Sequence, residues 1–139
     1  MIAITFPIKN NSIYTPCSVI SKETFMTRNC IAMWDTGATG SAISINLVNQ
    51  LKLKEKGTTT RATANGDIIC KTYKINICID KMHIENLHVH ALDMPNFDIL
   101  IGMDIIRQGN FSISGTPFNK VFSFCVPSVG IIDYQKIIK

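Results

Sequence analysis

Apolar and polar residues alternate along many short segments of this chain, and residues typical of turns separate the segments. A period of two is the pattern of a β-strand that buries one face against a core. The first such strand is expected at 2–8, and two more at 13–20 and from about residue 24 to 34. The pattern predicts an all-β domain with little helix.

Two β-rich segments, 58–63 and 68–79, meet at the dipeptide Asn65-Gly66. Both residues of this dipeptide tolerate positive φ, so it suits a tight hairpin. Apolar residues occupy alternate positions along the second segment, which predicts that one face of this arm is buried. Later strands are expected at 87–91, 98–101, 111–114 and 121–126.

The alternation is interrupted before Ser44, where a short helix competes with another strand. Ser44 is a suitable N-cap, and Ile45, Val48 and Leu51 would then fall on one side of the helix. We expect the helix, with that side turned toward the core.

A second short helix is expected over 103–108, with Asp104 near its positive end and Gly109 after its last residue. An apolar strand, a glycine-containing loop and a short helix therefore occur around Gly102, and the same order occurs around Gly37. Two pseudo-symmetric halves of one fold would have this pattern.

The chain has 139 residues, of which 46% are apolar and 17% are charged. This length is typical of one domain and is sufficient to bury one hydrophobic core. The 14 basic and 10 acidic residues give a net charge of +4 without a basic cluster. A nucleic-acid partner is therefore not expected.

No apolar run approaches the roughly 18 residues that a membrane span requires, so no membrane partner is expected. The five cysteines are odd in number, widely spaced and never in a C-x-x-C pair. This spacing argues for reduced, mostly buried thiols and against a disulfide framework or a four-sulfur zinc site. We expect a cytoplasmic protein.

Candidate chemistry centres on the segment Trp34-Asp35-Thr36-Gly37-Ala38, which follows an apolar strand. By chance, a D-T-G with a small residue after it occurs in roughly one chain of this length per few hundred. Two further landmarks follow it, namely the Asn65-Gly66 hairpin and the string Phe-Asp-Ile-Leu-Ile-Gly-Met-Asp at 97–104.

These three landmarks, in this order, are similar to those of the retropepsin-like aspartic proteases, the single-domain relatives of retroviral proteases. The third resembles bacterial retropepsin-like sequences and the protease domain of the DNA-damage-inducible protein more than the retroviral ones. The resemblance implies an all-β, retropepsin-like acid protease barrel with one or two short helices, working as a homodimer. It implies a protease domain at 1–127 and a tail of uncertain structure at 128–139.

Hydrolysis by an aspartic protease needs two carboxylates that share one water and hold one proton between them. The ionised carboxylate accepts a proton from the water, and the protonated one polarises the scissile carbonyl. This chain has one D-T-G, and the matching segment Ile101-Gly102 offers no carboxylate. A second Asp35 would therefore come from another copy across a two-fold axis.

The resemblance also implies roles for the residues after Asp35. Thr36 would reach across the axis to the partner's loop backbone. Gly37 would sit where the backbone approaches the carboxylate too closely for a Cβ. Ala38 would seat an extended substrate through its backbone.

By the same resemblance, the hairpin residues Ala64, Asn65, Gly66 and Asp67 would fold over the substrate and exclude water. Ile101 is counted with them as substrate-binding. The side-chain pockets are expected to be apolar. These inferences predict an aspartic endopeptidase that acts on extended polypeptides and uses no metal or other cofactor.

Four alternatives remain open at this stage. Asp35 could be an ordinary turn aspartate that bonds to its own loop, and the domain could be a non-catalytic peptide-binding or dimerisation module of the same fold. Asp98 or Asp104 could serve as an intrachain partner of Asp35, although the start of a strand and the start of a helix explain them better. His88 and His90 share one face of a strand, as zinc ligands would, but solvent exposure is the stronger expectation.

Overall fold

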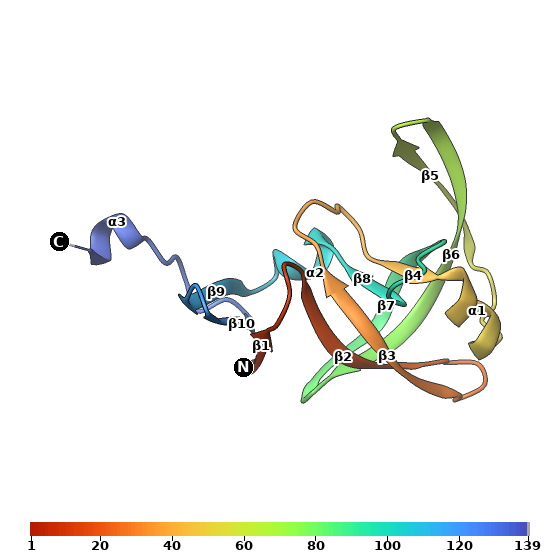
Figure 1. Ribbon diagram of the computed structural model, residues 1–139. Helices are drawn as coiled ribbons and strands as arrows, with labels where there is room; N and C mark the ends of the chain where they lie inside the picture. The colour runs from red at the N-terminus through yellow and green to blue at the C-terminus, as the bar shows by residue number, and fades with distance from the viewer. Residues whose placement is uncertain (139) are drawn as a thin grey trace.

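A computed structural model describes residues 1–138 of the chain. Strands dominate these residues, and the three helices are short (Figure 1). The elements are β1 (Ile2–Ile8), β2 (Ile13–Ile20), β3 (Thr27–Trp34), β4 (Ala42–Ser44), α1 (Ile45–Leu51), β5 (Gly57–Thr63), β6 (Gly66–Ile79), β7 (Met82–Leu92), β8 (Ile99–Ile101), α2 (Met103–Ile106), β9 (Asn110–Thr116), β10 (Asn119–Val126) and α3 (Tyr134–Ile137).

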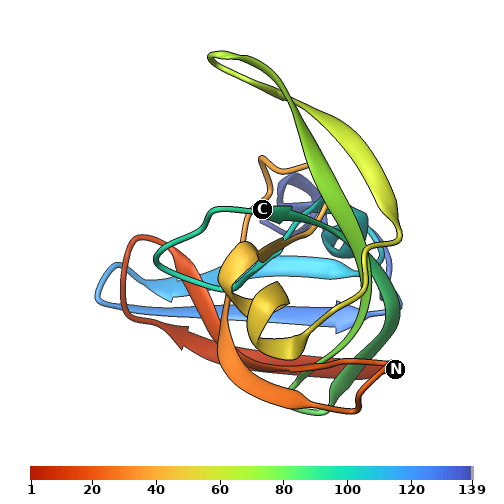
Figure 2. The ribbon, with the colours of Figure 1, turned by 90° about the vertical axis from the view of Figure 1, so that its right-hand side faces the viewer.

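The larger sheet has seven strands in the order β2-β3-β8-β4-β7-β6-β5. β2 also pairs with β6, and this second pairing closes the sheet into a barrel and leaves β5 outside it. β5 pairs with the first half of β6 from Gly57↔Thr72 to Thr63↔Gly66. This flap hairpin, residues 57–72, projects away from the barrel in both views (Figures 1 and 2).

A smaller sheet has the order β1-β10-β9, so the two ends of the folded domain pair with each other. Trp34, at the end of β3, joins this sheet to the barrel. Its ring lies 4.8 Å from that of Phe122 and 5.2 Å from that of Phe124, measured between centroids. Both phenylalanines belong to β10, so the aromatic cluster packs the small sheet against the strand that leads to Asp35.

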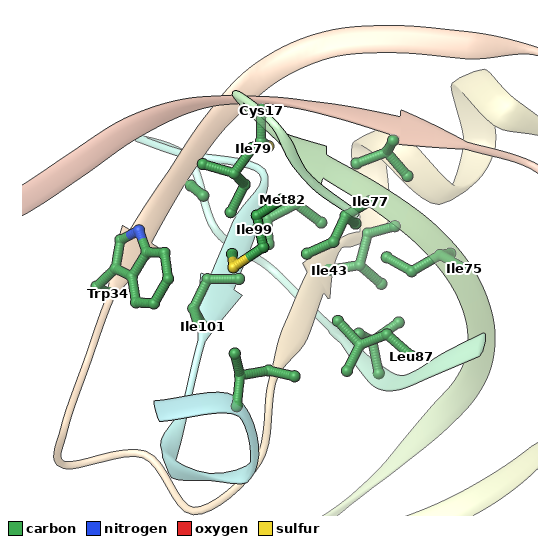
Figure 3. Close-up of a cluster of buried hydrophobic side chains, with 14 of the residues drawn as sticks. Cys17, Trp34, Ile43, Ile75, Ile77, Ile79, Met82, Leu87, Ile99 and Ile101 are labelled. Atoms are coloured by element: carbon green, nitrogen blue, oxygen red, sulfur yellow. The ribbon is translucent and has the colours of Figure 1, made fainter. Parts of the chain in front are cut away.

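The barrel interior is filled by branched aliphatic side chains. Figure 3 shows side chains of β2, β3, β4, β6, β7 and β8 meeting there. Along β6, alternate residues are at most 6% exposed, as the alternation in the sequence predicted. They are Tyr73, Ile75, Ile77 and Ile79.

Most strands occur close to where the alternation places them, but β3 begins three residues later than expected and β7 begins five residues earlier, at Met82. β4 precedes the expected helix as an additional short strand. The α1 helix begins after Ser44, whose hydroxyl accepts a hydrogen bond from the Leu47 N–H at 3.0 Å. Its buried face differs from the prediction, because Ile45 is 47% exposed and Leu47 is buried beside Val48 and Leu51. α2 is two residues shorter than expected.

The tip of the flap hairpin also differs by one position from the prediction. Thr63 pairs with Gly66, so the two turn residues are Ala64 and Asn65. Gly66 has φ of +108°, whereas Asn65 does not adopt positive φ. A type I turn followed by a glycine with positive φ is a common hairpin connection, and here only Gly66 needs that freedom.

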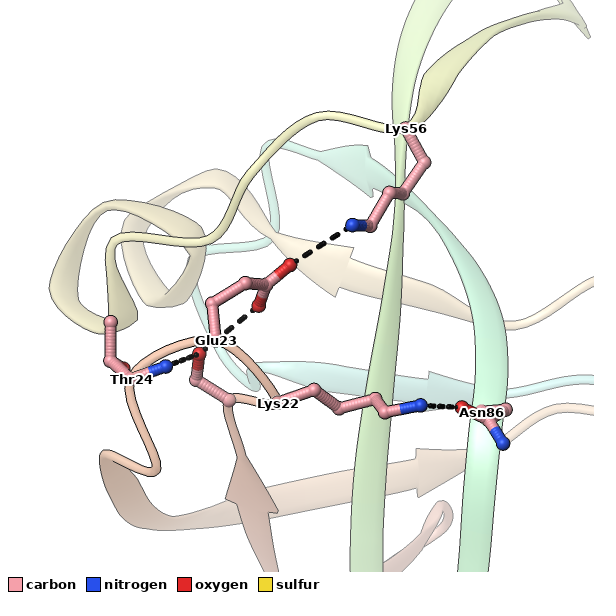
Figure 4. Close-up of polar contacts among 6 residues, drawn as sticks. Lys22, Glu23, Thr24, Lys56 and Asn86 are labelled. Carbon is pink, nitrogen blue, oxygen red and sulfur yellow. Dashed lines mark hydrogen bonds and ion pairs between the residues drawn. The ribbon is translucent and has the colours of Figure 1, made fainter.

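The base of the flap hairpin is tied to the loop between β2 and β3 (Figure 4). The ammonium of Lys56 lies 3.1 Å from the carboxylate of Glu23. Burial alone would raise the pKa of Glu23, but the hydrogen bond and the charge of Lys56 outweigh it and lower that pKa below its usual value. In the same loop Lys22 donates to the Asn86 side chain.

The five cysteines are free, and Cys17 faces Cys30 across β2 and β3 with 3.2 Å between the sulfur atoms. The hydrogen bond to Cys30 and burial raise the pKa of the Cys17 thiol well above its usual range. Cys17 and Cys70 are buried, and the other three are half-buried.

The C-terminal segment leaves β10 and ends in α3, a single turn that projects from the rest of the domain in Figure 1. No side chain of α3 is buried. The last residue of the expected tail, Lys139, lies outside the described residues. In 1–138, no helix combines the length and the apolar character needed to cross a membrane.

Candidate active site

Asp35 is the first residue after β3, in a loop that leads to β4. Its backbone N–H donates to the Ile101 carbonyl at 2.9 Å, and its carboxylate accepts the Gly37 N–H at 2.8 Å. A Cβ on Gly37 would lie 3.1 Å from that carboxylate oxygen, which is tighter than ordinary contact. The loop therefore holds a half-buried carboxylate in one orientation and favours glycine two residues later.

A second loop, around Gly102, lies directly against the first. The N–H of Met103 donates to the Ala38 carbonyl at 2.8 Å. A Cβ on Gly102 would come within 2.8 Å of the Gly40 carbonyl, so the two backbones pack too closely for any side chain there. β3 and β8, the strands that carry these loops, are parallel neighbours. The repeated pattern around Gly37 and Gly102 thus corresponds to two loops in contact.

The two other aspartates near these loops are bonded to serine side chains. Asp98 accepts the hydroxyl of Ser44 at 2.7 Å. Asp104 accepts the hydroxyl of Ser41 at 2.8 Å and the Ser41 N–H at 3.1 Å. Both carboxylates brace the backbone, which agrees with their expected structural role and argues against an intrachain partner for Asp35.

A pocket of about 450 Å³ lies between the Asp35 loop and the flap hairpin. The side-chain pockets were expected to be apolar, whereas this pocket is mixed, because a guanidinium, an imidazole and threonines line it together with glycine and alanine residues. We call it the Arg61 pocket, and its lining residues are Gly37, Ala38, Thr39, Gly40, Thr59, Thr60, Arg61, Ala62 and His90.

Within the Arg61 pocket, a nitrogen of the Arg61 guanidinium lies 2.8 Å from Nε2 of His90. Arginine has only donors, so Nε2 accepts and the proton of the neutral ring is on Nδ1. Burial and the charge of Arg61 lower the pKa of His90 below its ordinary value, while Asp104 and the Ser41 backbone act in the opposite direction. His90 is therefore an uncharged acceptor at neutral pH.

The expected solvent exposure of His90 is wrong. His90 pairs with Ala42 of β4, and the loop residue Gly40 lies beside its ring, so the end of β7 is covered. His88, two residues earlier, is exposed as predicted. Across the described residues, no group of three or more His, Cys, Asp or Glu side chains is arranged to hold a metal.

The other residues predicted for the site are placed in three different ways. Thr36 and Gly37 are exposed and Ala38 is half-buried in the Asp35 loop. The hairpin tip, Ala64–Asp67, is exposed and does not line the Arg61 pocket. Ile101 is 0% exposed within the barrel, so its predicted substrate contact is not available to its side chain. It contributes its carbonyl to Asp35 instead.

Sequence reasoning did not find Arg61 as a site residue. Its position in the flap hairpin was visible, but its contact with His90, a residue of β7 that pairs with Ala42 of β4, was not. The H-x-H alternation at 88–90 was the available signal, and it pointed to the correct strand face without showing that β4 covers its end.

Comparison with known proteins identifies the family and the fold. Residues 24–108, more than half of the chain, match the family model described as "gag-polyprotein putative aspartyl protease". No curated protein matches the chain.

Among solved structures, the fold is similar to that of a retropepsin-like aspartic protease from Rickettsia conorii. That match has a TM-score of 0.56 and 16% identity and covers 89% of this chain and 92% of the other. The EIAV protease complexed with the inhibitor HBY-793 has a TM-score of 0.55 and 19% identity, covering 72% of this chain and 92% of the other. The barrel is thus a retropepsin-like fold, and the chain belongs to the gag-polyprotein aspartyl protease family.

Proposed function

We propose that this protein is a homodimeric aspartic endopeptidase in which each subunit supplies Asp35 to a shared site. The observation that carries the proposal is how the carboxylates near the Asp35 and Gly102 loops are hydrogen-bonded. Asp35 is half-buried and held by its own loop, whereas Asp98 and Asp104 are occupied by Ser44 and Ser41. A dyad built on this loop needs its second carboxylate from another copy.

The proposed reaction uses one proton shared by the two Asp35 side chains. The ionised carboxylate takes a proton from water as the water oxygen bonds to the scissile carbonyl carbon. The protonated carboxyl gives its proton to the carbonyl oxygen, which yields a neutral tetrahedral intermediate. The C–N bond then breaks as the carboxyl that took the water proton gives it to the leaving nitrogen. The other carboxylate takes a proton from a hydroxyl of the intermediate as the new carbonyl forms, so the dyad again holds one proton.

The substrate is proposed to be an extended polypeptide between the Asp35 loop and the flap hairpin. The flap hairpin projects beyond the barrel and its backbone can pair with an added strand. The EIAV protease, which shares the fold, was solved with an inhibitor bound. A peptide in this position would contact the backbone of Ala38, and the tip residues 64–67 on closure, while Thr36 would reach across the axis to the partner's loop.

The first experiment measures cleavage of a peptide library by the unaltered protein and by Asp35→Asn. The amide cannot accept the water proton, so activity is expected to fall by at least about a thousandfold. Asp93→Asn, an exposed change outside the site, serves as the control. Equal cleavage by the unaltered protein and Asp35→Asn would exclude the proposal. Absence of cleavage with retained peptide binding would favour a non-catalytic peptide-binding module.

A mixing experiment tests whether the site is shared. Unaltered and Asp35→Asn chains are mixed in equal amounts at a total concentration above the dimer dissociation constant, and their subunits are allowed to exchange. If each site needs two Asp35 side chains, about one dimer in four remains active, so the rate falls to about a quarter of that of the same total amount of unaltered protein. A rate of one half would indicate independent monomers, and sedimentation would report the assembly directly.

A further inference from the structure

The Arg61 pocket is adjacent to the Asp35 loop, which is the catalytic loop of the proposed function, and its only charged lining residue is a cation. Three segments line it, at 37–40, 59–62 and His90. None of the lining residues is acidic, and Arg61 is a fixed cation among small and hydroxyl side chains. A pocket of this composition complements an anionic group rather than an apolar one.

Arg61 has hydrogen-bonding capacity that the protein does not use. Its guanidinium carries five N–H donors. Over residues 1–138, its one side-chain hydrogen bond is the 2.8 Å contact with His90. The ion pairs over the same range are Lys56–Glu23 and Lys71–Glu55, so Arg61 has no carboxylate partner there.

His90 fixes the direction of this cation. Because Nε2 accepts from Arg61, one edge of the guanidinium is held against β7. This bond holds one nitrogen of the planar guanidinium and restricts its orientation, and the remaining N–H donors stay available. Two parallel N–H groups of a guanidinium match the two oxygens of a carboxylate, and such charge-assisted pairs are stronger in a partly enclosed site than in water.

We propose that the Arg61 pocket is a subsite that selects an acidic side chain of the substrate, with Arg61 as the specificity-determining residue and His90 as its positioning residue. This inference rests on the proposed function for the reaction, whereas the selection itself can be measured as binding. The substrate class is then a polypeptide with Asp or Glu close to the scissile bond.

The experiment uses one cleaved peptide from the library and replaces each position on both sides of the scissile bond by Glu or by Gln. The Glu and Gln side chains have nearly the same shape, so the ratio of kcat/KM for the Glu peptide to kcat/KM for the Gln peptide reports the effect of the negative charge. At one position, the Glu peptide is expected to be cleaved at least about tenfold better. Arg61→Gln is expected to bring that ratio close to one, and Arg61→Lys, which keeps the charge but not the planar fork, to leave an intermediate ratio.

Arg28→Gln is the matched control, because it removes an exposed arginine of β3. It is expected to keep the Glu preference. A Glu-to-Gln ratio of one or below at every position would overturn the inference, as would a preference that Arg61→Gln leaves intact. In either case cleavage itself would still support the proposed function.

The same peptides are also tested for binding to Asp35→Asn protein by fluorescence anisotropy. If the unaltered protein cleaves no library peptide, the Glu and Gln series is made on a library peptide that binds. Arg61-dependent binding of its Glu form would then mean that the proposed function fails and the subsite stands. Equal binding of Glu and Gln peptides would overturn the subsite. Folding of each variant is checked by its denaturation midpoint.

The role of His90 is tested by a split between KM and kcat. His90→Ala is expected to raise KM for the Glu peptide more than for the Gln peptide, because Arg61 loses its fixed direction. His90→Gln, whose amide oxygen can accept from Arg61, is expected to restore part of the preference. A His90→Ala variant with an unchanged Glu-to-Gln ratio would remove His90 from the proposal.

Discussion

The hydroxyl of Ser41 donates a 2.8 Å hydrogen bond to the carboxylate of Asp104, although the two residues lie 63 positions apart. The same hydroxyl accepts the N–H of Gly102 at 3.1 Å. Ser41 ends the Asp35 loop and Asp104 belongs to α2, so this contact joins the two central loops. The position of the Asp35 loop therefore depends on the hydrogen bonds that Ser41 makes with Asp104 and Gly102.

Asp104→Ala is expected to lower the free energy of unfolding by about 1–3 kcal/mol. The substitution leaves the N–H and the hydroxyl of Ser41 without their acceptor in a partly buried site. Chemical denaturation measures the change. Asp93→Ala, at an exposed position, is expected to stay within about 0.5 kcal/mol of the unaltered protein. Equal stability of the two variants would contradict a bracing role for Asp104.

Gly102→Ala is expected to destabilise the protein by about 1–3 kcal/mol or more. Its Cβ would meet the Gly40 carbonyl at 2.8 Å and the Ala38 carbonyl at 2.9 Å, and both contacts are with backbone that cannot rotate away. Gly57→Ala is the control, since the nearest atom to its Cβ would be a threonine hydroxyl at 3.5 Å. The thermal midpoint of each variant checks the difference, and similar midpoints would refute the close packing of the two loops.

Strands such as β6 were predictable because they bury one face, and a strict alternation has few other interpretations. The Ser44 cap was predictable for a local reason, since its hydroxyl bonds within its own turn. The exposure of Ile45 was not predictable, because helical period allows either Ile45 or Leu47 to share a face with Val48 and Leu51, and tertiary packing selects Leu47.

The resemblance located Asp35 but not the pocket beside it. Arg61 and His90 come from strands that are both paired with β6, and their contact depends on how the flap hairpin bends over β7 and on the cover that β4 provides. Neither feature follows from alternation or from motif spacing. The same holds for the Ser41–Asp104 contact, which depends on the parallel pairing of β3 with β8.

Thr15→Val is expected to lower the free energy of unfolding by about 1–3 kcal/mol, because the buried Trp34 indole N–H donates to the Thr15 hydroxyl at 3.0 Å. Valine has the shape of threonine but no acceptor. Trp34 is the single tryptophan of the chain, so its fluorescence reports the unfolding of Thr15→Val, and circular dichroism follows the unfolding of variants that lack Trp34. Thr5→Val, at an exposed contact with Ser123, is the control and should change stability little. The double variant, Thr15→Val with Trp34→Phe, should lose less free energy of unfolding than the sum of the losses in the two single variants.

His90→Gln is expected to make stability less sensitive to mild acid. The pKa of His90 is lowered in the folded state from its ordinary value of 6.5 by burial and by Arg61. Below that value the unfolded chain takes up a proton that the folded chain takes up only at lower pH, so the free energy of unfolding falls as pH falls. The favourable contribution of neutral His90 is thus present above pH 6.5 and is lost on acidification through the folded pKa.

Urea denaturation at a series of pH values from 8 down to 5 measures this loss, and the difference between the unaltered protein and His90→Gln isolates the contribution of His90. The glutamine keeps an acceptor for Arg61 but does not titrate. The free energy of unfolding of the variant, relative to that of the unaltered protein, should therefore rise as the pH falls through this interval. His88→Gln removes an exposed histidine of the same strand and should leave the slope close to that of the unaltered protein. Parallel curves for the unaltered protein and His90→Gln would mean that burial and the Arg61 charge do not hold His90 in its neutral form.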